Sequence, residues 1–104
     1  MTQTAFHPGE HIQEEQDELS MSVEDMAARL GVAPDFLGSV LEGSQSVTAE
    51  FALRLGHFFG TSAQFWLNLQ SRFDLEQAAR LYGAEIEVLP MLQAASASDG
   101  RYGF

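Results

Sequence analysis

Histidines and carboxylates are the residues of this sequence with the greatest capacity for chemistry. His7, Glu10 and His11 stand in the order H-x-x-E-H, the motif of inverted zinc proteases. That chemistry needs both histidines on one face of a continuous helix and a distant third ligand. Pro8 and Gly9 interrupt the motif, and proline favours the first turn of a helix. The segment is therefore interpreted as a helix start, and no metal site is predicted.

Other catalytic arrangements find no support in the sequence. There is no cysteine, which excludes thiolate zinc sites, disulfides and cysteine nucleophiles. No Gly-rich phosphate loop or Ser–His–Asp set can be assigned. His57 stands alone among apolar residues and is interpreted as a partly exposed packing residue. The adjacent Glu14 and Glu15 face different ways on a helix. We predict that the chain is not an enzyme and needs no cofactor.

The net charge is the unusual feature of the composition. Fifteen Asp and Glu residues face five Lys and Arg residues, giving −10 over 104 residues, a length that suits one domain. Such a protein is repelled by nucleic acids and anionic membranes and attracted to a basic partner, although the charge could equally serve solubility alone. With no signal peptide and no apolar run long enough to cross a bilayer, a cytoplasmic protein is expected.

Capping residues and glycines divide the chain into short amphipathic helices. Ser22, Thr48 and Ser62 are predicted N-caps, and glycines close most of the helices. The pattern predicts helices over residues 8–19, 22–30, 34–42, 48–59 and 62–73, and a sixth over 74–82 beginning at Asp74. Residues 85–89 alternate like a short strand, and residues 94–104 form a polar tail.

Two of these helices have the pattern of a helix–turn–helix. The segments 22–30 and 34–42 are joined by the short turn Gly31-Val32-Ala33, although a small helical bundle with one tight turn would look similar. We predict an all-α fold of five to six helices. Its helix–turn–helix domain spans residues 8–83, between an N-terminal arm (1–7) and a C-terminal extension (84–104).

Several strings support a family resemblance: His7-Pro8-Gly9-Glu10, Ser22-Val23-Glu24-Asp25-Met26-Ala27, Val47-Thr48, and above all Gly60-Thr61-Ser62-Ala63-Gln64-Phe65-Trp66-Leu67-Asn68-Leu69-Gln70 followed by Phe73-Asp74-Leu75. Over residues 7–80 the chain resembles the HigA-type antitoxins, the plasmid-maintenance antidote family within the Xre-like group. The resemblance implies a lambda-repressor-like domain that forms a homodimer. It further implies binding and neutralisation of a small basic RelE-like toxin that cuts mRNA on the ribosome, together with repression of the protein's own operon.

The resemblance places candidate DNA contacts on the two helix–turn–helix segments and the loop that follows. They are Ser22, Val23, Pro34, Asp35, Phe36, Gly38, Ser39, Ser44, Gln45 and Ser46. Relatives usually carry Lys or Arg over the stretch that corresponds to residues 33–46, whereas this chain has none there and two acids. Because phosphate neutralisation supplies most non-specific DNA affinity, operator binding is expected to be weak or toxin-assisted.

The arginines do not compensate for this deficit. Three of them follow an acid by four residues on a predicted helix, the favourable order for an ion pair. The pairs are Asp25–Arg29, Glu50–Arg54 and Glu76–Arg80, which leaves Arg72 and Arg101 without such a neighbour.

Two further surfaces are predicted. The acidic face of the first helix, Glu10, Glu14, Glu15, Asp17 and Glu18, is a candidate toxin contact or else a solvated face. Phe65, Trp66 and Phe73 are core residues or part of a dimer interface. The alternative function is a helix–turn–helix protein that has lost DNA binding and acts through protein contacts alone.

Overall fold

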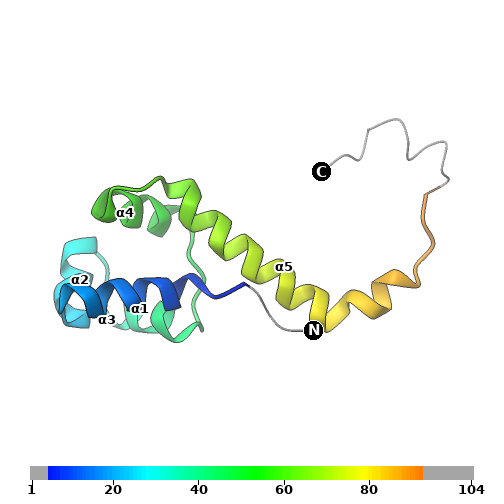
Figure 1. Cartoon of the computed structure of the whole chain (residues 1–104), viewed down its shortest axis with the longest axis horizontal. Coiled ribbons are helices and arrows are strands. Elements are labelled where there is room, and N and C mark those ends of the chain that lie inside the picture. Colours follow the sequence, from blue (N-terminus) through cyan, green and yellow to red (C-terminus); the bar gives the residue numbers. More distant parts are fainter. Residues whose placement is uncertain (1–4, 93–104) are drawn as a thin grey trace.

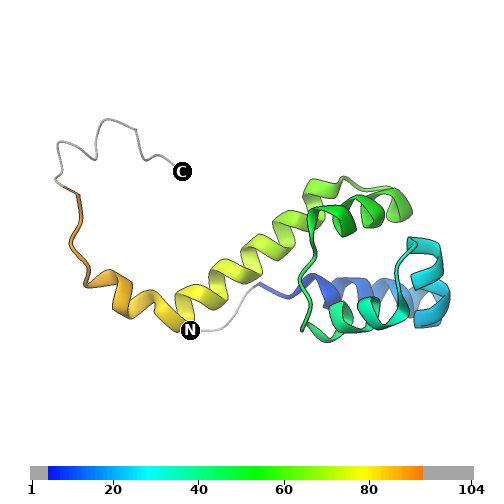
Figure 2. The same ribbon diagram turned by 180° about the vertical axis from the view of Figure 1, so that it is seen from behind.

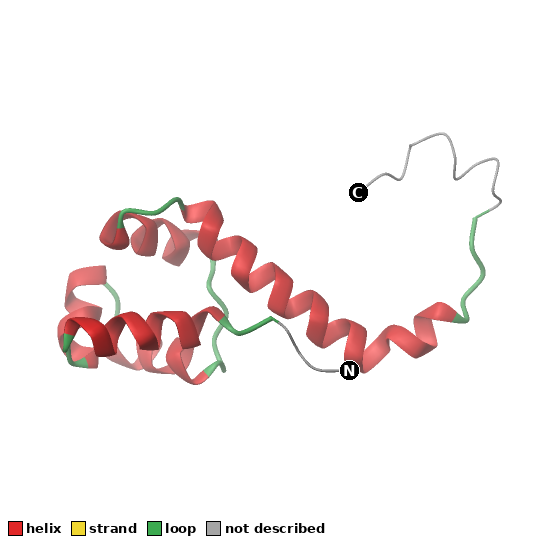
Figure 3. Ribbon diagram, viewed as in Figure 1, coloured by secondary structure: helices red, strands yellow, loops and turns green. Residues whose placement is uncertain are grey.

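Five helices account for most of residues 5–92, the part of the chain that this computed structural model describes. In chain order they are α1 (Pro8–Leu19), α2 (Val23–Leu30), α3 (Pro34–Glu42), α4 (Ala49–Phe59) and α5 (Ala63–Glu87). Figure 1 shows α1 to α4 gathered at one end, with α5 running away from them as a long arm. The fold is all-α as predicted, and residues 5–92 contain no strand (Figure 3).

Apolar side chains from every helix meet in one core. The fully or almost fully buried members are Ile12, Met26, Ala27, Leu30, Leu37, Val40, Val47, Phe51, Ala52, Leu55 and Trp66. Burying an aliphatic or aromatic side chain of this size contributes about 1.5–3 kcal/mol. The core therefore fixes α2 and α3 relative to α1, α4 and the first turns of α5.

Local sequence chemistry sets the helix boundaries. Ser22, Thr48 and Ser62 each accept a hydrogen bond from a backbone N–H of the first turn, and a glycine follows α2, α3 and α4. These features confirm the predicted ends of α2, α3 and α4 and the start of α5. Leu19 of α1 is exposed, which leaves Ile12 as the large aliphatic anchor of this helix in the core.

The packing of α1 on α3 depends on a glycine. Gly9 is buried, and a Cβ added at this position would overlap the carbonyl oxygen of Val40. Because glycine has no Cβ, the two helix backbones can approach this closely. Gly9 therefore positions the N-terminal end of α1 against α3, the second helix of the helix–turn–helix.

The sequence-based prediction was wrong about the last helices. The predicted break at Asp74 and the predicted strand at residues 85–89 are both absent, because α5 is continuous from Ala63 to Glu87. Asp74 accepts a hydrogen bond from Gln70 Nε2 at 3.0 Å within the helix and caps nothing. Glutamate is a good helix former, and no neighbouring strand exists among residues 5–92 to pair with residues 85–89. Figure 2 shows that α5 bends in its last turns.

Candidate nucleic-acid and protein interfaces

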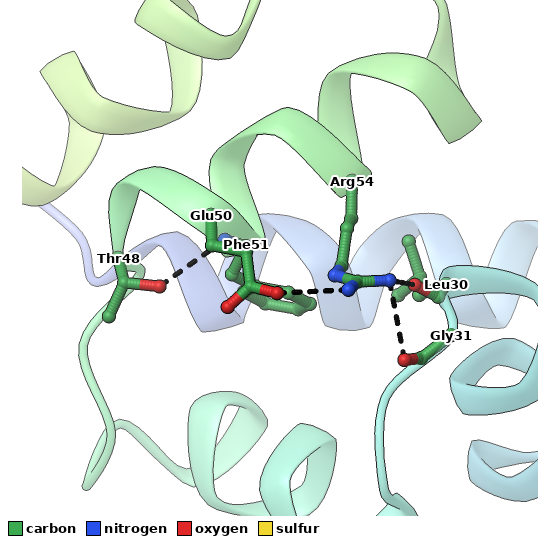
Figure 4. A network of polar contacts seen from close by, with 6 residues as sticks. All are labelled: Leu30, Gly31, Thr48, Glu50, Phe51 and Arg54. Carbon is green, nitrogen blue, oxygen red and sulfur yellow. Dashed lines mark hydrogen bonds and ion pairs between the residues drawn. The ribbon is translucent and has the colours of Figure 1, made fainter.

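The helix–turn–helix is held by its own caps and by an arginine from α4. Ser22 Oγ accepts a hydrogen bond from Asp25 N at 3.0 Å, and Gly31 turns the chain with a φ of 75°. Arg54 Nη1 donates to the carbonyl oxygens of Leu30 at 3.1 Å and Gly31 at 3.3 Å (Figure 4). These carbonyls end α2 and have no helical partner. Arg54 therefore stabilises the turn between α2 and α3 through these hydrogen bonds.

The residues predicted to contact DNA lie together on α3, at the start of α2 and in the loop after α3. Pro34 and Asp35 are exposed, and Gly38 and Ser39 are half-buried. The Phe36 ring lies edge-on to the Phe51 ring, with 5.1 Å between centroids, so part of this side chain belongs to the core. The exposed part of α3 is therefore short, small and acidic.

Several polar groups of this surface already have backbone partners. Ser44 Oγ donates to the Ser39 carbonyl at 3.2 Å, and Gln45 Nε2 donates to the Ser46 carbonyl at 3.2 Å. The half-buried Val23 packs against the core. The N-terminus of α3 has no side-chain cap, which leaves backbone N–H groups there that can donate to an anion, beside the Asp35 carboxylate. The surface offers hydrogen bonds to DNA but little positive charge.

One of the predicted ion pairs near this surface forms and another does not. Arg54 Nη2 lies 2.9 Å from Glu50 Oε2, which confirms that pair (Figure 4). The prediction was wrong for Asp25 and Arg29, since Arg29 is exposed and forms no ion pair within residues 5–92. The side chain of Asp25 is solvated at the first turn of α2, where the helix dipole favours an acid. Arg29 therefore remains a free positive charge at the end of α2.

The five acidic residues predicted to contact a toxin share one helix but not one environment. Glu10, Glu14, Asp17 and Glu18 are exposed, whereas Glu15 is half-buried. Glu14, Glu15, Asp17 and Glu18 together line an open depression. None of the five forms an ion pair within residues 5–92, so the negative charge of this face is uncompensated by the fold.

The two histidines of the H-x-x-E-H string have different environments. His7 is buried as the N-cap of α1, where its Nδ1 accepts a hydrogen bond from Gly9 N at 2.9 Å. Burial lowers the pKa of His7 below 6.5, and the nearby Asp74 and Glu10 oppose this shift. His11 is exposed, and its ring lies edge-on to the rings of Phe65 and Trp66. Among the described residues no group of three or more His, Cys, Asp or Glu side chains could hold a metal ion.

The three aromatic residues predicted at a dimer interface differ in exposure. Trp66 is only 1% exposed, and its Nε1 donates to Thr61 Oγ1 at 2.8 Å, so it has almost no surface to offer a second chain. Phe65 is 38% exposed, and the half-buried Phe73 packs edge-on against His7 at 5.0 Å between centroids. Phe65 therefore provides most of the exposed aromatic surface in this set.

A larger apolar surface lies further along α5, and the sequence-based reasoning missed it. Leu75, Leu81, Tyr82 and Ile86 are each at least half-exposed on the arm that leaves the domain. The spacing of Leu75, Ala79, Tyr82 and Ile86 alternates between four and three residues, as along a coiled-coil seam. This seam was hidden by the predicted helix end at residue 82 and the incorrect strand over residues 85–89, which divided one apolar stripe between two elements.

Comparison with known proteins identifies the family. A scan against protein-family models finds no match. The chain is 38% identical over 73 residues to the uncharacterized helix-turn-helix-type transcriptional regulator YddM of Escherichia coli strain K12, covering 70% of this chain and 78% of the relative. The solved structure of an addiction module antidote protein of the HigA family from Coxiella burnetii is 40% identical, with a TM-score of 0.80 over 86% of this chain and all 100% of that one. The chain belongs to the HigA antitoxin family.

A second HigA-family structure is solved with nucleic acid. It is the antitoxin HigA of Pseudomonas aeruginosa with the higBA promoter, which is 36% identical to this chain. Its TM-score is 0.79 over 86% of this chain and 100% of that chain.

Within residues 5–92 of the present HigA-family protein, no helix is long and apolar enough to cross a membrane.

A buried glutamine connects the HigA-family string at residues 60–70 to the helix–turn–helix. Gln70 Oε1 accepts a hydrogen bond from Val47 N at 2.7 Å, and Gln70 is 5% exposed. Val47 lies in the loop between α3 and α4 that carries predicted DNA contacts. No periodic signal marks this residue, since a glutamine on a helix is usually solvated. Its role depends on a tertiary contact 23 residues away in sequence.

Proposed function

We propose that this HigA-family protein is the antitoxin of a type II toxin–antitoxin pair and neutralises a small basic RelE-like toxin that cuts mRNA. The similarity to HigA antidote structures along their whole length carries the proposal. The net charge of −10 and the uncompensated acidic face of α1 support it, because opposite fields speed and orient association. Action on ribosome-bound mRNA would place the pair in the cytoplasm.

Growth rescue tests this proposal. The product of the adjacent reading frame is induced with and without this chain, and growth is measured. We expect wild-type protein to restore growth. The double variant Glu14→Gln/Glu18→Gln should rescue less than Glu85→Gln/Glu87→Gln, which removes the same charge from the exposed end of α5. Equal rescue by the two variants would mean that the α1 face is merely solvated, and no rescue by wild type would contradict the antitoxin function.

Operator binding is proposed as a second activity that depends on the toxin. The HigA structure with its promoter makes DNA the natural ligand of the helix–turn–helix, but α3 and its flanks here lack Lys and Arg over residues 33–46. A homodimer would carry twice −10, or −20, toward a polyanion. A bound basic toxin would cancel part of this charge. In a titration of the protein's own upstream DNA at low and physiological salt, we expect the toxin to tighten binding, and tight binding by the free protein at physiological salt would contradict this mechanism.

The apolar seam of α5 is proposed as a homodimer interface. A single chain exposes Leu75, Tyr82 and Ile86 along one arm, and a second copy of the arm would cover them. Light scattering after size exclusion should give a dimer for the wild type and a monomer for Ile86→Asp. A charge placed in a buried seam would be desolvated without a partner. If Ile86→Asp is still a dimer, the seam is not part of the interface.

A second candidate function is a purely protein-binding regulator. The exposed face of α3 carries Asp35 and Glu42 and no Lys or Arg. This negative charge favours a protein-binding regulator over a repressor that binds DNA without its toxin. This candidate requires that DNA binding is absent with and without the product of the adjacent gene. Any toxin-dependent, salt-sensitive binding to the upstream DNA would rule it out.

A further inference from the structure

A small pocket lies between α1 and the turn that joins α4 to α5. Its volume is about 140 Å³, and it is lined by His11, Glu15, Phe59, Thr61, Phe65 and Trp66. One water molecule needs about 10–15 Å³ of such space, so the pocket can hold a planar side-chain group with a methylene or two and is too small for a helix. The pocket adjoins the acidic depression of α1, with Glu15 lining both.

Four aromatic rings form most of the wall. The centroid distances from Trp66 are 5.1 Å to Phe65, 5.5 Å to Phe59 and 5.4 Å to His11. The Trp66 indole is fixed by its hydrogen bond to Thr61 Oγ1 and forms the buried back of the pocket. Phe65, at 38% exposure, presents accessible ring surface. Aromatic faces carry partial negative charge and attract cations.

Glu15 adds a full negative charge to this wall. Of the five acids on the α1 face it alone is half-buried, and it has no hydrogen-bond or ion-pair partner within residues 5–92. A partly desolvated carboxylate without a partner interacts more strongly with an incoming cation than a fully solvated one does. Glu15 is the only acid in the lining and no Lys or Arg lies there, so the pocket is electrostatically complementary to one positive side chain.

We propose that this pocket receives an arginine side chain of the basic protein that the antitoxin binds. Arginine fits better than lysine, because its planar guanidinium stacks on aromatic rings while donating paired hydrogen bonds to a carboxylate. The identity of the partner rests on the proposed function, whereas the ligand chemistry rests on the pocket itself. The surrounding acids steer the partner, and the pocket fixes its position on α1.

The pocket is tested directly with a small probe. N-acetyl-arginine amide is titrated into the full chain at physiological salt, with the neutral isostere N-acetyl-citrulline amide as the matched ligand. Trp66 is the only tryptophan, so its indole N–H gives a single NMR resonance at the back of the pocket. We expect a saturable shift with the arginine probe, with a Kd on the order of 1 mM. The citrulline probe should produce a much smaller shift.

Variants separate the pocket from general electrostatic attraction. Glu15→Gln should weaken arginine binding roughly three-fold, the size of a partly exposed ion pair. Glu87→Gln removes the same charge about 30 Å away along α5 and should leave binding unchanged. Phe65→Leu should also weaken binding, and Phe6→Leu, at an exposed ring outside this pocket, should not. Equal effects of the two charge variants, or no saturable shift with arginine, would overturn the proposal.

Binding of the adjacent-gene product to the pocket variants separates the arginine pocket from the antitoxin function. If the adjacent-gene product binds the wild type and Glu15→Gln and Phe65→Leu equally well, the antitoxin function stands and the pocket is not the contact. If the arginine probe binds but no toxin is captured, the pocket stands and the assigned partner is wrong.

Discussion

Replacing Gln70 with methionine should destabilise the protein far more than the same change on the solvent side of the helix. Gln70 is 5% exposed and accepts the hydrogen bond from Val47 N at 2.7 Å. Methionine has a similar length and supplies no comparable acceptor. The Val47 N–H would then be buried without a partner, because Val47 is itself 3% exposed.

The expected magnitude follows from that unpaired donor. Leaving a buried N–H unsatisfied costs about 1–3 kcal/mol. The lost bond from Gln70 Nε2 to Asp74, one turn along the helix, adds only about 0.2–0.5 kcal/mol. We therefore expect a loss of about 2 kcal/mol in the free energy of unfolding, which lowers Tm by roughly 8–16 °C for a domain of this size.

Gln64 provides the matched control on the same helix. Its Nε2 donates to Asn68 Oδ1 at 2.9 Å, an exposed bond with the same four-residue spacing. Gln64→Met should therefore cost only about 0.2–0.5 kcal/mol. Urea denaturation followed by circular dichroism measures both variants. If Gln70→Met and Gln64→Met lose the same stability, the bond between α5 and the α3–α4 loop does not hold the domain together as described.

Three further predictions concern single residues. Burial lowers the pKa of His7 below 6.5, so the fold favours the neutral imidazole. The stability that this preference provides is present above pH 6.5 and should be lost as the pH falls below 6.5. His7→Asn should lessen that loss in denaturation curves taken from about pH 8 to pH 5. Gly9→Ala should destabilise the protein by roughly 1–3 kcal/mol, because the added Cβ overlaps α3. Gly38→Ala should stabilise α3 by about 0.5–1 kcal/mol, because its added Cβ meets nothing within 4 Å. Equal effects of the two variants in thermal melts would contradict this packing. Asp35→Asn should tighten operator binding roughly two- to five-fold in the salt titration, and an unchanged Kd would remove this residue from the DNA-facing surface.

Local signals were sufficient to predict the first four helices. Serine and threonine caps act within one turn and glycines act at one residue, so Ser22, Thr48, Gly31 and Gly60 could be interpreted without knowledge of distant contacts. The same reasoning failed on α5. Asp74 has the chemistry of an N-cap, but a cap needs extended backbone at that residue, and α5 is continuous helix from Ala63 to Glu87.

The candidate sites were predictable only where charge alone defines them. The acidic face of α1 and the lack of basic residues over 33–46 follow from composition and helical spacing. The pocket at Glu15 and Phe65 joins segments 50 residues apart in sequence, and the bond of Gln70 to Val47 joins segments 23 apart. Such contacts depend on how helices pack, which a single-sequence pattern does not encode.

Toxin capture by purified protein tests whether this protein is an antitoxin. The full chain is titrated into the purified product of the adjacent gene, and mRNA cleavage on ribosomes is measured in the same samples as complex formation by calorimetry. We predict a salt-sensitive complex and cleavage that stops once the chain saturates the product. A product that continues to cut mRNA in the presence of excess chain, with no heat of binding, would contradict the assignment of this protein as its antitoxin.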